Sequence, residues 1–474
     1  MVGVNYMKKF ILLLFLGLIV SQDSRTAYSV SGQVYLENSD DYSGVQISFY
    51  DLLQDPPVLF DFTLSDENGY YQIDLEAGYY LIEWTKDGYV PWEQGGFAHG
   101  SDIVLDDVEL LSGDVITLTG EQSGNWTTAY QYWIEGDVVV PEGQTLTIDP
   151  GVRIKFYEDA SLTCYGTLEA NGTQSDPVLF TSKQPIPQPG DWDNLELHGI
   201  NNVLSHVIYE YASDGITGGD ASYSTFDYVF IDGATLPLYS NGIVLEGIEM
   251  SFTNNNIYLP SGDNVAIEVT HSDYVNYDYG DYPDYNGECI YNPSHSIFND
   301  NILTARIGIH SKNISYGNQY TNNTISAIET AIKSSNCGNC IISDNVIDSQ
   351  LQNSGPNQGI EYDSNCFNCG WADWCIPDNS NMQINGNTIV SRSRGIWGKD
   401  DGDNNTISNN NITGFIKYAG IYSGHGAEII DNHIERTQIE GDGYETLLYA
   451  RNSTISNNNI IDYASNYNVR IHFY

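Results

Sequence analysis

Four side chains able to take part in acid–base chemistry recur at matching places in the second half of the chain. Glu268, His310, Lys333 and Glu361 each follow a small residue and an isoleucine. His310 and Lys333 fall in neighbouring repeats, where a nearby ammonium favours a neutral imidazole that can act as a base in β-elimination. A solvated face with incidental charge variety is the competing interpretation.

The two carboxylates of this set do not suit a glycosidase. Glu268 and Glu361 are three repeats apart, which predicts a separation on the order of 14 Å between stacked strands. Retaining and inverting glycosidases place their carboxylates roughly 5 Å and 6.5–9.5 Å apart. A base-catalysed elimination is therefore the better catalytic hypothesis for these residues.

The element that must position these side chains is a recurring strand in which a small residue precedes an isoleucine and a variable residue. Strand side chains alternate between faces, so the isoleucine is predicted to point inward and the variable residue outward. The copies are Gly215-Ile216-Thr217, Gly242-Ile243-Val244, Ala266-Ile267-Glu268, Gly308-Ile309-His310, Ala331-Ile332-Lys333, Gly359-Ile360-Glu361, Gly395-Ile396-Trp397 and Gly420-Ile421-Tyr422.

A hexapeptide of the form apolar-x-x-Asn-x-apolar recurs between these strands. Its asparagines are Asn255, Asn323, Asn345, Asn387, Asn410, Asn432 and Asn458, and Asp300 is expected to take the place once. Several steps are 22 or 23 residues long, which predicts one turn of a solenoid per repeat. Stacked asparagines can form a hydrogen-bonded ladder at one corner of successive turns.

Two long insertions, at about 270–293 and 363–381, follow the strands of Glu268 and Glu361. They are expected to border a substrate-binding floor, because loops on a rigid scaffold commonly carry binding sites. Trp397 and Tyr422 extend this floor, and Trp371 and Trp374 lie in the second insertion. Aromatic side chains suit sugar rings.

The first insertion is acidic and could bind calcium. Its candidate oxygen ligands are Asp278, Asp281, Asp284 and Glu288. The spacing lacks the twelve-residue calcium-loop pattern, so a merely solvated loop is the alternative.

Seven cysteines complete the set of reactive residues. Cys164 is alone in an early repeat and is predicted to be a buried thiol. The other six, Cys289, Cys337, Cys340, Cys366, Cys369 and Cys375, cluster around the insertions. Export favours disulfides that tie the insertions down, with pairing open, whereas paired C-x-x-C spacings also permit zinc.

Charge and hydropathy limit the partners and the compartment. A net charge of −46 excludes nucleic acid as a partner, because phosphate binding requires clustered Lys and Arg. Met7-Lys8-Lys9 and the apolar run 10–20 predict a signal peptide within residues 1–22, and no membrane span is expected. The protein is predicted to be secreted or held at the cell surface. The end at Tyr474 carries no evident polar cap, which predicts a fragment or association through that end.

Residues 30–110 have a different texture, with short alternating runs separated by turn clusters. The segments S-G-Q-V, G-V-Q-I, S-D-E-N-G-Y-Y-Q-I and A-G-Y-Y-L-I resemble the carboxypeptidase regulatory-like family, a small transthyretin-like β-sandwich. That resemblance implies a non-catalytic spacer or binding module.

The remainder, residues 111–474, resembles secreted right-handed parallel β-helix proteins of the pectate-lyase-like superfamily. The resemblance rests on T-L-T-I-D-P-G-V-R-I-K-F at 145–156, G-T-L-E-A-N-G-T at 166–173 and S-H-V-I-Y-E-Y-A at 205–212. In this family the strands of the small-Ile-x type usually line the substrate groove. The fold hosts lyases, hydrolases and adhesins alike, and no catalytic motif of the lyases is matched here.

The sequence thus predicts an all-β protein consisting of a signal peptide, a small β-sandwich and a β-helix of about a dozen turns. The favoured function is glycan binding or adhesion through the face that carries the long loops. A calcium-assisted polysaccharide lyase and a structural spacer are the alternatives.

Overall fold

A computed structural model describes residues 27–54, 57–184, 186–259, 264–270, 294–312, 316–349, 357–363, 381–398, 404–414, 416–437, 447–463 and 471–473. The chain divides into two compact units. Unit 1 comprises residues 1–116, 128–132 and 183–187, and unit 2 comprises 117–127, 133–182 and 188–474. Within the described ranges, no helix has the length and hydropathy needed to cross a membrane.

Unit 1 contains two small sheets. One is formed by β4 (Tyr70–Glu76), β1 (Ala27–Leu36), β7 (Ile103–Val104) and β8 (Val108–Leu110). The other is formed by β3 (Val58–Leu64), β2 (Gln46–Asp51), β5 (Gly78–Thr85) and β6 (Trp92–His99). Side chains of both sheets, including Val34, Phe49 and Trp84, are buried in one apolar core.

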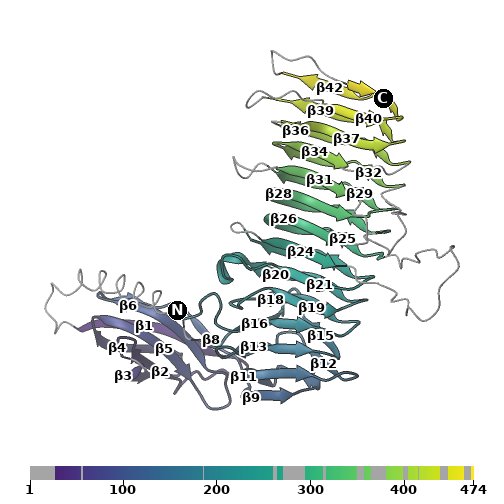
Figure 1. Ribbon diagram of the computed structural model, residues 1–474. Helices are drawn as coiled ribbons and strands as arrows, with labels where there is room; N and C mark the ends of the chain where they lie inside the picture. Colours follow the sequence, from purple (N-terminus) through teal and green to yellow (C-terminus); the bar gives the residue numbers. More distant parts are fainter. Residues whose placement is uncertain are drawn as a thin grey trace. The chain divides into compact units, whose positions relative to one another are not determined.

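Unit 2 is a stack of turns built from short strands, and this stack is called the coil here. Each turn pairs in parallel with the next, so the turns stack in chain order (Figure 1). The strands fall into three ladders, named here the face, second and third ladders. The coil opens with β9 (Asp114–Glu121), which pairs with β11 (Tyr130–Val140).

The face ladder continues from the end of β11 through β14 (Leu162–Cys164), β17 (Leu195–Leu197), β19 (Ile216–Asp220), β21 (Ile243–Glu246), β24 (Val265–Thr270), the later parts of β26 (Ile302–Lys312) and β28 (Thr324–Ser335), β31 (Gln358–Asp363), β34 (Arg394–Gly398), β37 (Ala419–His425), β40 (Leu448–Arg451) and β43 (Ile471–Phe473).

The second ladder contains β10 (Gly124–Trp126), β12 (Thr145–Ile148), β15 (Thr167–Asn171), the first parts of β18 (Val203–Tyr209) and β20 (Thr225–Asp232), β22 (Ser251–Thr253), β25 (Ile297–Asn299), β27 (Gln319–Thr321), β29 (Ile341–Ser343), β32 (Gln383–Asn385), β35 (Thr406–Ser408), β38 (Glu428–Ile430) and β41 (Thr454–Ser456).

The third ladder contains β13 (Arg153–Phe156), β16 (Val178–Ser182), the later parts of β18 and β20, β23 (Asn256–Tyr258), the first parts of β26 and β28, β30 (Val346–Ser349), β33 (Thr388–Ser391), β36 (Asn411–Gly414), β39 (His433–Arg436) and β42 (Asn459–Asp462). One short 3-10 helix, η1 (Gly233–Thr235), interrupts the described strands.

The predicted asparagine ladder lies at the corner between the second and third ladders. Asn410 shows its chemistry: its Nδ2 donates to Asn432 Oδ1 and to the Ile384 carbonyl, both at 2.9 Å. Its Oδ1 accepts from the backbone N and the side-chain Nδ2 of Asn387, at 3.1 and 2.8 Å. The ladder runs through Asn255, Asn301, Asn323, Asn345, Asn387, Asn410, Asn432 and Asn458.

The expectation that Asp300 replaces one ladder asparagine is wrong. Asn301 occupies the position and donates to Asn323 Oδ1 at 2.8 Å. Asp300 precedes it in a left-handed backbone conformation, with φ 55°, and Asn254 does the same before Asn255, with φ 53°. Both Asp and Asn tolerate this conformation, so Asp300 occupies the left-handed position immediately before the ladder asparagine.

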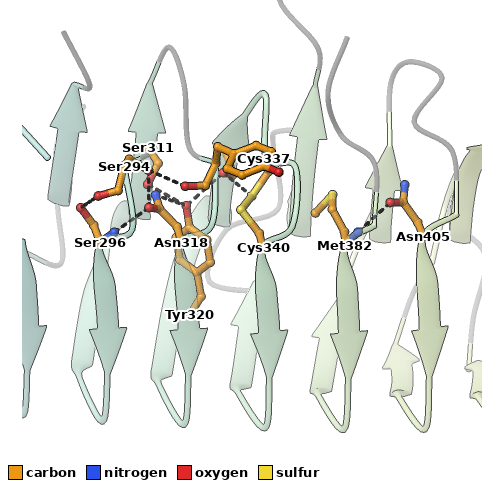
Figure 2. Close-up of a disulfide and its surroundings, with 11 residues drawn as sticks. Ser294, Ser296, Ser311, Asn318, Tyr320, Cys337, Cys340, Met382 and Asn405 are labelled. Atoms are coloured by element: carbon orange, nitrogen blue, oxygen red, sulfur yellow. Dashed lines mark hydrogen bonds between the residues drawn. A yellow bond between two sulfur atoms is a disulfide. The ribbon is translucent and has the colours of Figure 1, made fainter. Parts of the chain in front are cut away.

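The interior of the coil joins an aromatic stack to a polar cluster. Phe226, Phe252, Phe298 and Tyr320 stack in successive turns with ring centroids 5.0–5.1 Å apart. The Tyr320 hydroxyl donates to Ser311 Oγ at 2.8 Å. Figure 2 shows this cluster beside the disulfide between Cys337 and Cys340, both of which are buried.

The described structure confirms an all-β protein with a large parallel sheet of many strands, an arrangement consistent with a β-helix. The isoleucines of the small-Ile-x strands, such as Ile309, Ile332 and Ile360, are buried as predicted. The residues that follow them form one column on the outside of the face ladder.

Candidate functional site

The variable residues of the face ladder are in register across the coil, as the sequence predicts. The pairing runs from Thr217 and Val244 into a chemically richer stretch, named here the face column. The face column consists of Glu268, His310, Lys333, Glu361, Trp397, Tyr422 and Tyr449. Neighbouring members are about 4.8 Å apart along the ladder.

Glu268 and His310 of the face column and the nearby Lys312 form a hydrogen-bonded cluster. His310 Nδ1 lies 3.1 Å from Glu268 Oε2, and Lys312 Nζ donates to Glu268 Oε1 at 2.5 Å. The Glu268 side chain is 13% exposed and that of His310 15%. Burial alone raises the pKa of Glu268, but the hydrogen bonds from His310 and Lys312 and their charges hold it below its usual value. The carboxylate is therefore ionised and oriented toward the imidazole.

This arrangement differs from the predicted His310–Lys333 pair in what His310 contacts. The two residues are adjacent in register, but the imidazole forms its hydrogen bond with Glu268. A carboxylate that is hydrogen-bonded to an imidazole orients the ring, as in general-base arrangements. Lys312 was missed because it follows the variable position by two residues; strand alternation was the signal that could have found it.

The expectation of a solvated face is wrong for Glu361. This residue is 3% exposed, because it lies between Lys333 and the large ring of Trp397 in the register of the ladder. A carboxylate at this depth is retained only when neighbouring groups compensate for lost hydration. Glu361 therefore contributes to the packing of the face column and adds little to its solvent-exposed surface.

The aromatic end of the face column is stacked on itself. The Trp397 and Tyr422 ring centroids are 4.3 Å apart, and those of Tyr422 and Tyr449 are 4.4 Å apart. The Arg394 guanidinium lies 3.8 Å from the Trp397 ring centroid. Both faces of the Tyr422 ring are thus covered, and a sugar can reach this segment mainly through ring edges and the polar groups beside them. Tyr449 was missed because Leu447 and Leu448 replace the small-Ile pair in its turn.

Cationic residues are unevenly distributed along the coil. The sequence contains no Lys or Arg between Lys183 and Arg306. Arg306, Lys312, Lys333 and Arg394 then follow on or beside the face ladder. Cationic side chains therefore accompany the carboxylates of Glu268 and Glu361 along the face column in a strongly acidic chain.

Several predicted site residues lie outside the described residues. These are Trp371, Trp374, Asp278, Asp281, Asp284, Glu288, Cys289, Cys366, Cys369 and Cys375. The strands that lead into the two insertions end at Thr270 and Asp363, where the sequence places the start of each insertion. Among the described residues, no group of three or more His, Cys, Asp or Glu residues could hold a metal ion.

The cysteine predictions are partly resolved. Disulfides were predicted with their pairing open; Cys337 and Cys340 are bonded to each other, and this bond closes a local turn and does not tie down an insertion. The bond also removes both thiolates as zinc ligands. Cys164 is a buried free cysteine as predicted, and burial raises the pKa of its thiol to about 12.

Substituting Glu268 by Gln is expected to lower the free energy of unfolding by about 1–3 kcal/mol at neutral pH, because His310 and Lys312 lose a charged acceptor. The folded-state pKa of Glu268 is lowered, so this stabilisation is present above the unfolded-state value of about 4.3 and is lost as pH falls through the folded value. Urea denaturation at pH 7 and in acid measures the difference, which should narrow in acid. Glu428→Gln, at an exposed position of β38, is the control. An equal loss of unfolding free energy in both variants contradicts the stabilising role of the Glu268 carboxylate.

A comparison with known protein families finds a match in the region of the chain that forms the coil. Residues 119–219 match a family model described as a pectate-lyase-like beta helix domain. No curated protein sequence matches the chain.

Three solved structures that are similar to this chain have low TM-scores. A type II cohesin–X-dockerin complex from Acetivibrio cellulolyticus is 19% identical with a TM-score of 0.16, and the match covers 18% of this chain and 58% of that one. The catalytic domain of a GH87 alpha-1,3-glucanase in complex with tetrasaccharides is 13% identical over 94% and 88% of the two chains, with a TM-score of 0.33. An alginate lyase from Paenibacillus sp. is 12% identical over 66% and 91%, with a TM-score of 0.18. Scores this low establish no shared activity.

Proposed function

We propose that the chain is an exported, surface-associated protein whose stacked turns form a right-handed parallel β-helix and bind glycans through the face column. The observation that carries this proposal is the change in that column from Thr217 and Val244 to the run Glu268 to Tyr449. An unbroken row of charged and aromatic side chains on a rigid sheet matches the repeating polar groups of an extended glycan. The family match at residues 119–219 agrees with a carbohydrate-related role.

Lys333 in the face column and Lys312 beside it favour a glycan that carries carboxylate or sulfate groups. Lys312 keeps 40% of its side-chain surface exposed, and Lys333 is half-buried one turn further. The long-range field of a −46 chain repels polyanions, but at physiological salt that repulsion extends only about 8 Å. Local ammonium groups can then attract an acidic sugar at close range.

Replacing Lys333 by Ala is expected to weaken retention of an acidic polysaccharide about tenfold, because it removes one half-buried cation from the centre of the column. Affinity electrophoresis in gels containing polygalacturonate or alginate measures the change. Lys155→Ala, on β13 of the third ladder, removes the same charge from another side of the coil and should have no effect. Equal loss in both variants would indicate a non-specific charge effect.

The second candidate is a polysaccharide lyase, favoured by the contact between His310 and Glu268. His310 would act as the base that removes a proton beside a uronate carboxylate, with Lys333 stabilising the charge that develops. Unsaturated-sugar absorbance, followed with calcium and with chelator, tests this candidate. Activity that disappears in His310→Ala supports it, and a flat trace with folded wild-type protein removes it.

The remaining parts of the proposal rest on the sequence. Residues 1–22 act as a signal peptide, residues 30–110 form a carboxypeptidase regulatory-like module, and residues 111–474 form the β-helix. In the insertions, calcium is bound by Asp278, Asp281, Asp284 and Glu288, and sugars are contacted by Trp371 and Trp374. A purely structural spacer is the outcome if neither binding nor turnover is observed.

A further inference from the structure

The outer side of the third ladder carries a second group of aromatic residues, away from the face column. Tyr228 and Phe230 point outward from β20, and Tyr258 points outward from the adjacent β23. Their exposed fractions are 49%, 37% and 48%. These three residues are named here the ring patch, and they lie on two paired strands, β20, which is labelled in Figure 1, and β23.

The rings of this patch are open where those of the face column are covered. Phe230 is followed in register by Asn256, and Tyr258 is followed by Thr304. Both followers are shorter than an aromatic ring, so one face of each ring extends beyond its neighbour. Among the described residues, no other aromatic ring stacks on Phe230 or Tyr258, whereas one face of Tyr228 is covered by His206 at 4.4 Å.

The polar groups around the ring patch are acceptors and amides. Asp232 lies directly beside Tyr258 in register, and Asn256 lies beside Phe230. Glu210 follows β18, and its Oε2 accepts from Thr181 Oγ1 at 3.2 Å. The sequence from 184 to 305 contains no Lys or Arg. Carboxylates without cations repel polyanions and accept hydrogen bonds from sugar hydroxyls.

We infer that the ring patch is a second glycan-binding surface, and that its ligand is an uncharged polysaccharide chain. The ring faces of Phe230 and Tyr258 stack on pyranose rings, while Asp232 and Asn256 bind hydroxyl groups. Neighbouring strands about 4.8 Å apart place these contacts along an extended chain. The ring patch and the face column then differ in charge, so one coil can bind a neutral and an acidic glycan on different sides.

Affinity electrophoresis of the full chain in gels containing xyloglucan or glucomannan tests this inference. Wild-type protein should be retarded, and Phe230→Ala and Tyr258→Ala should each weaken retention about tenfold. Ile302→Ala is the matched control, because Ile302 is 55% exposed in the same column as Phe230 but has no ring. It should leave retention unchanged.

The binding test of the ring patch can be distinguished from the binding test of the face column. Lys333→Ala should leave retention by neutral polysaccharides unchanged, and Tyr258→Ala should leave retention by polygalacturonate unchanged. Melting curves of the ring-patch variants should match the wild type, because the side chains are exposed. A folded wild type that neutral polysaccharides do not retard, or a Phe230→Ala/Tyr258→Ala double variant that binds like the wild type, overturns the inference.

Discussion

Replacing Asn410 by Leu is expected to lower the free energy of unfolding by about 3–5 kcal/mol, which is among the largest effects of a single substitution. Asn410 is 1% exposed, and its side chain makes four hydrogen bonds to three other residues. Leucine leaves the Asn387 backbone N–H and the Ile384 carbonyl buried without these partners, and each such group costs about 1–3 kcal/mol. Chemical denaturation followed by circular dichroism measures the loss.

The next residue supplies the control. Asn411 has the same side chain but points outward and is exposed on β36. Asn411→Leu should change the free energy of unfolding by no more than about 0.5 kcal/mol. Because a stacked coil can open locally, hydrogen exchange at Asn387 and Asn432 should rise in Asn410→Leu only. Equal stability of the two variants contradicts the structural role of the ladder.

Arg436→Met is expected to lower the free energy of unfolding by about 3–5 kcal/mol, because it leaves the buried carboxylate of Asp462 without its main partner. Arg436 Nε donates to Asp462 Oδ1 at 3.0 Å and Nη2 donates to Oδ2, and the two side chains are 2% and 3% exposed. The preceding residue in this column is Gly414, which leaves room for the long arginine.

The double variant Arg436→Met/Asp462→Leu provides the test of cause. Replacing both members of a buried ion pair with apolar residues of similar volume is often neutral or stabilising. The double variant should therefore recover most of the stability lost in Arg436→Met, as measured by thermal and urea denaturation. If it is less stable than Arg436→Met alone, the loss comes from packing and the assignment to charge is wrong.

Periodic features of this chain could be predicted from the sequence because each turn repeats one local solution. The asparagine corner and the buried isoleucines recur with fixed neighbours, so the residues that stack could be identified before any coordinates. Asn301 was misassigned because Asp300 and Asn301 are both compatible with a left-handed corner. The hydrogen bond from Asn301 to Asn323 and the left-handed backbone of Asp300 separate the two positions.

Features that break the repeat could not be predicted in this way. The burial of Glu361 depends on the size of Trp397 one turn away, and the contact between His310 and Glu268 depends on side-chain rotamers. The bond between Cys337 and Cys340 was one of several pairings allowed by six clustered cysteines. The ring patch was overlooked because its residues belong to two different strands and share no motif.

The central claim is that the face column binds glycans, and retention of the chain by an acidic polysaccharide tests it most directly. Wild-type protein and Lys333→Ala should be run side by side in gels with and without polygalacturonate. The polysaccharide is expected to retard the wild type, and the retardation is expected to fall about tenfold in Lys333→Ala. Identical mobility of folded wild-type protein with and without polysaccharide, repeated with alginate, would contradict it.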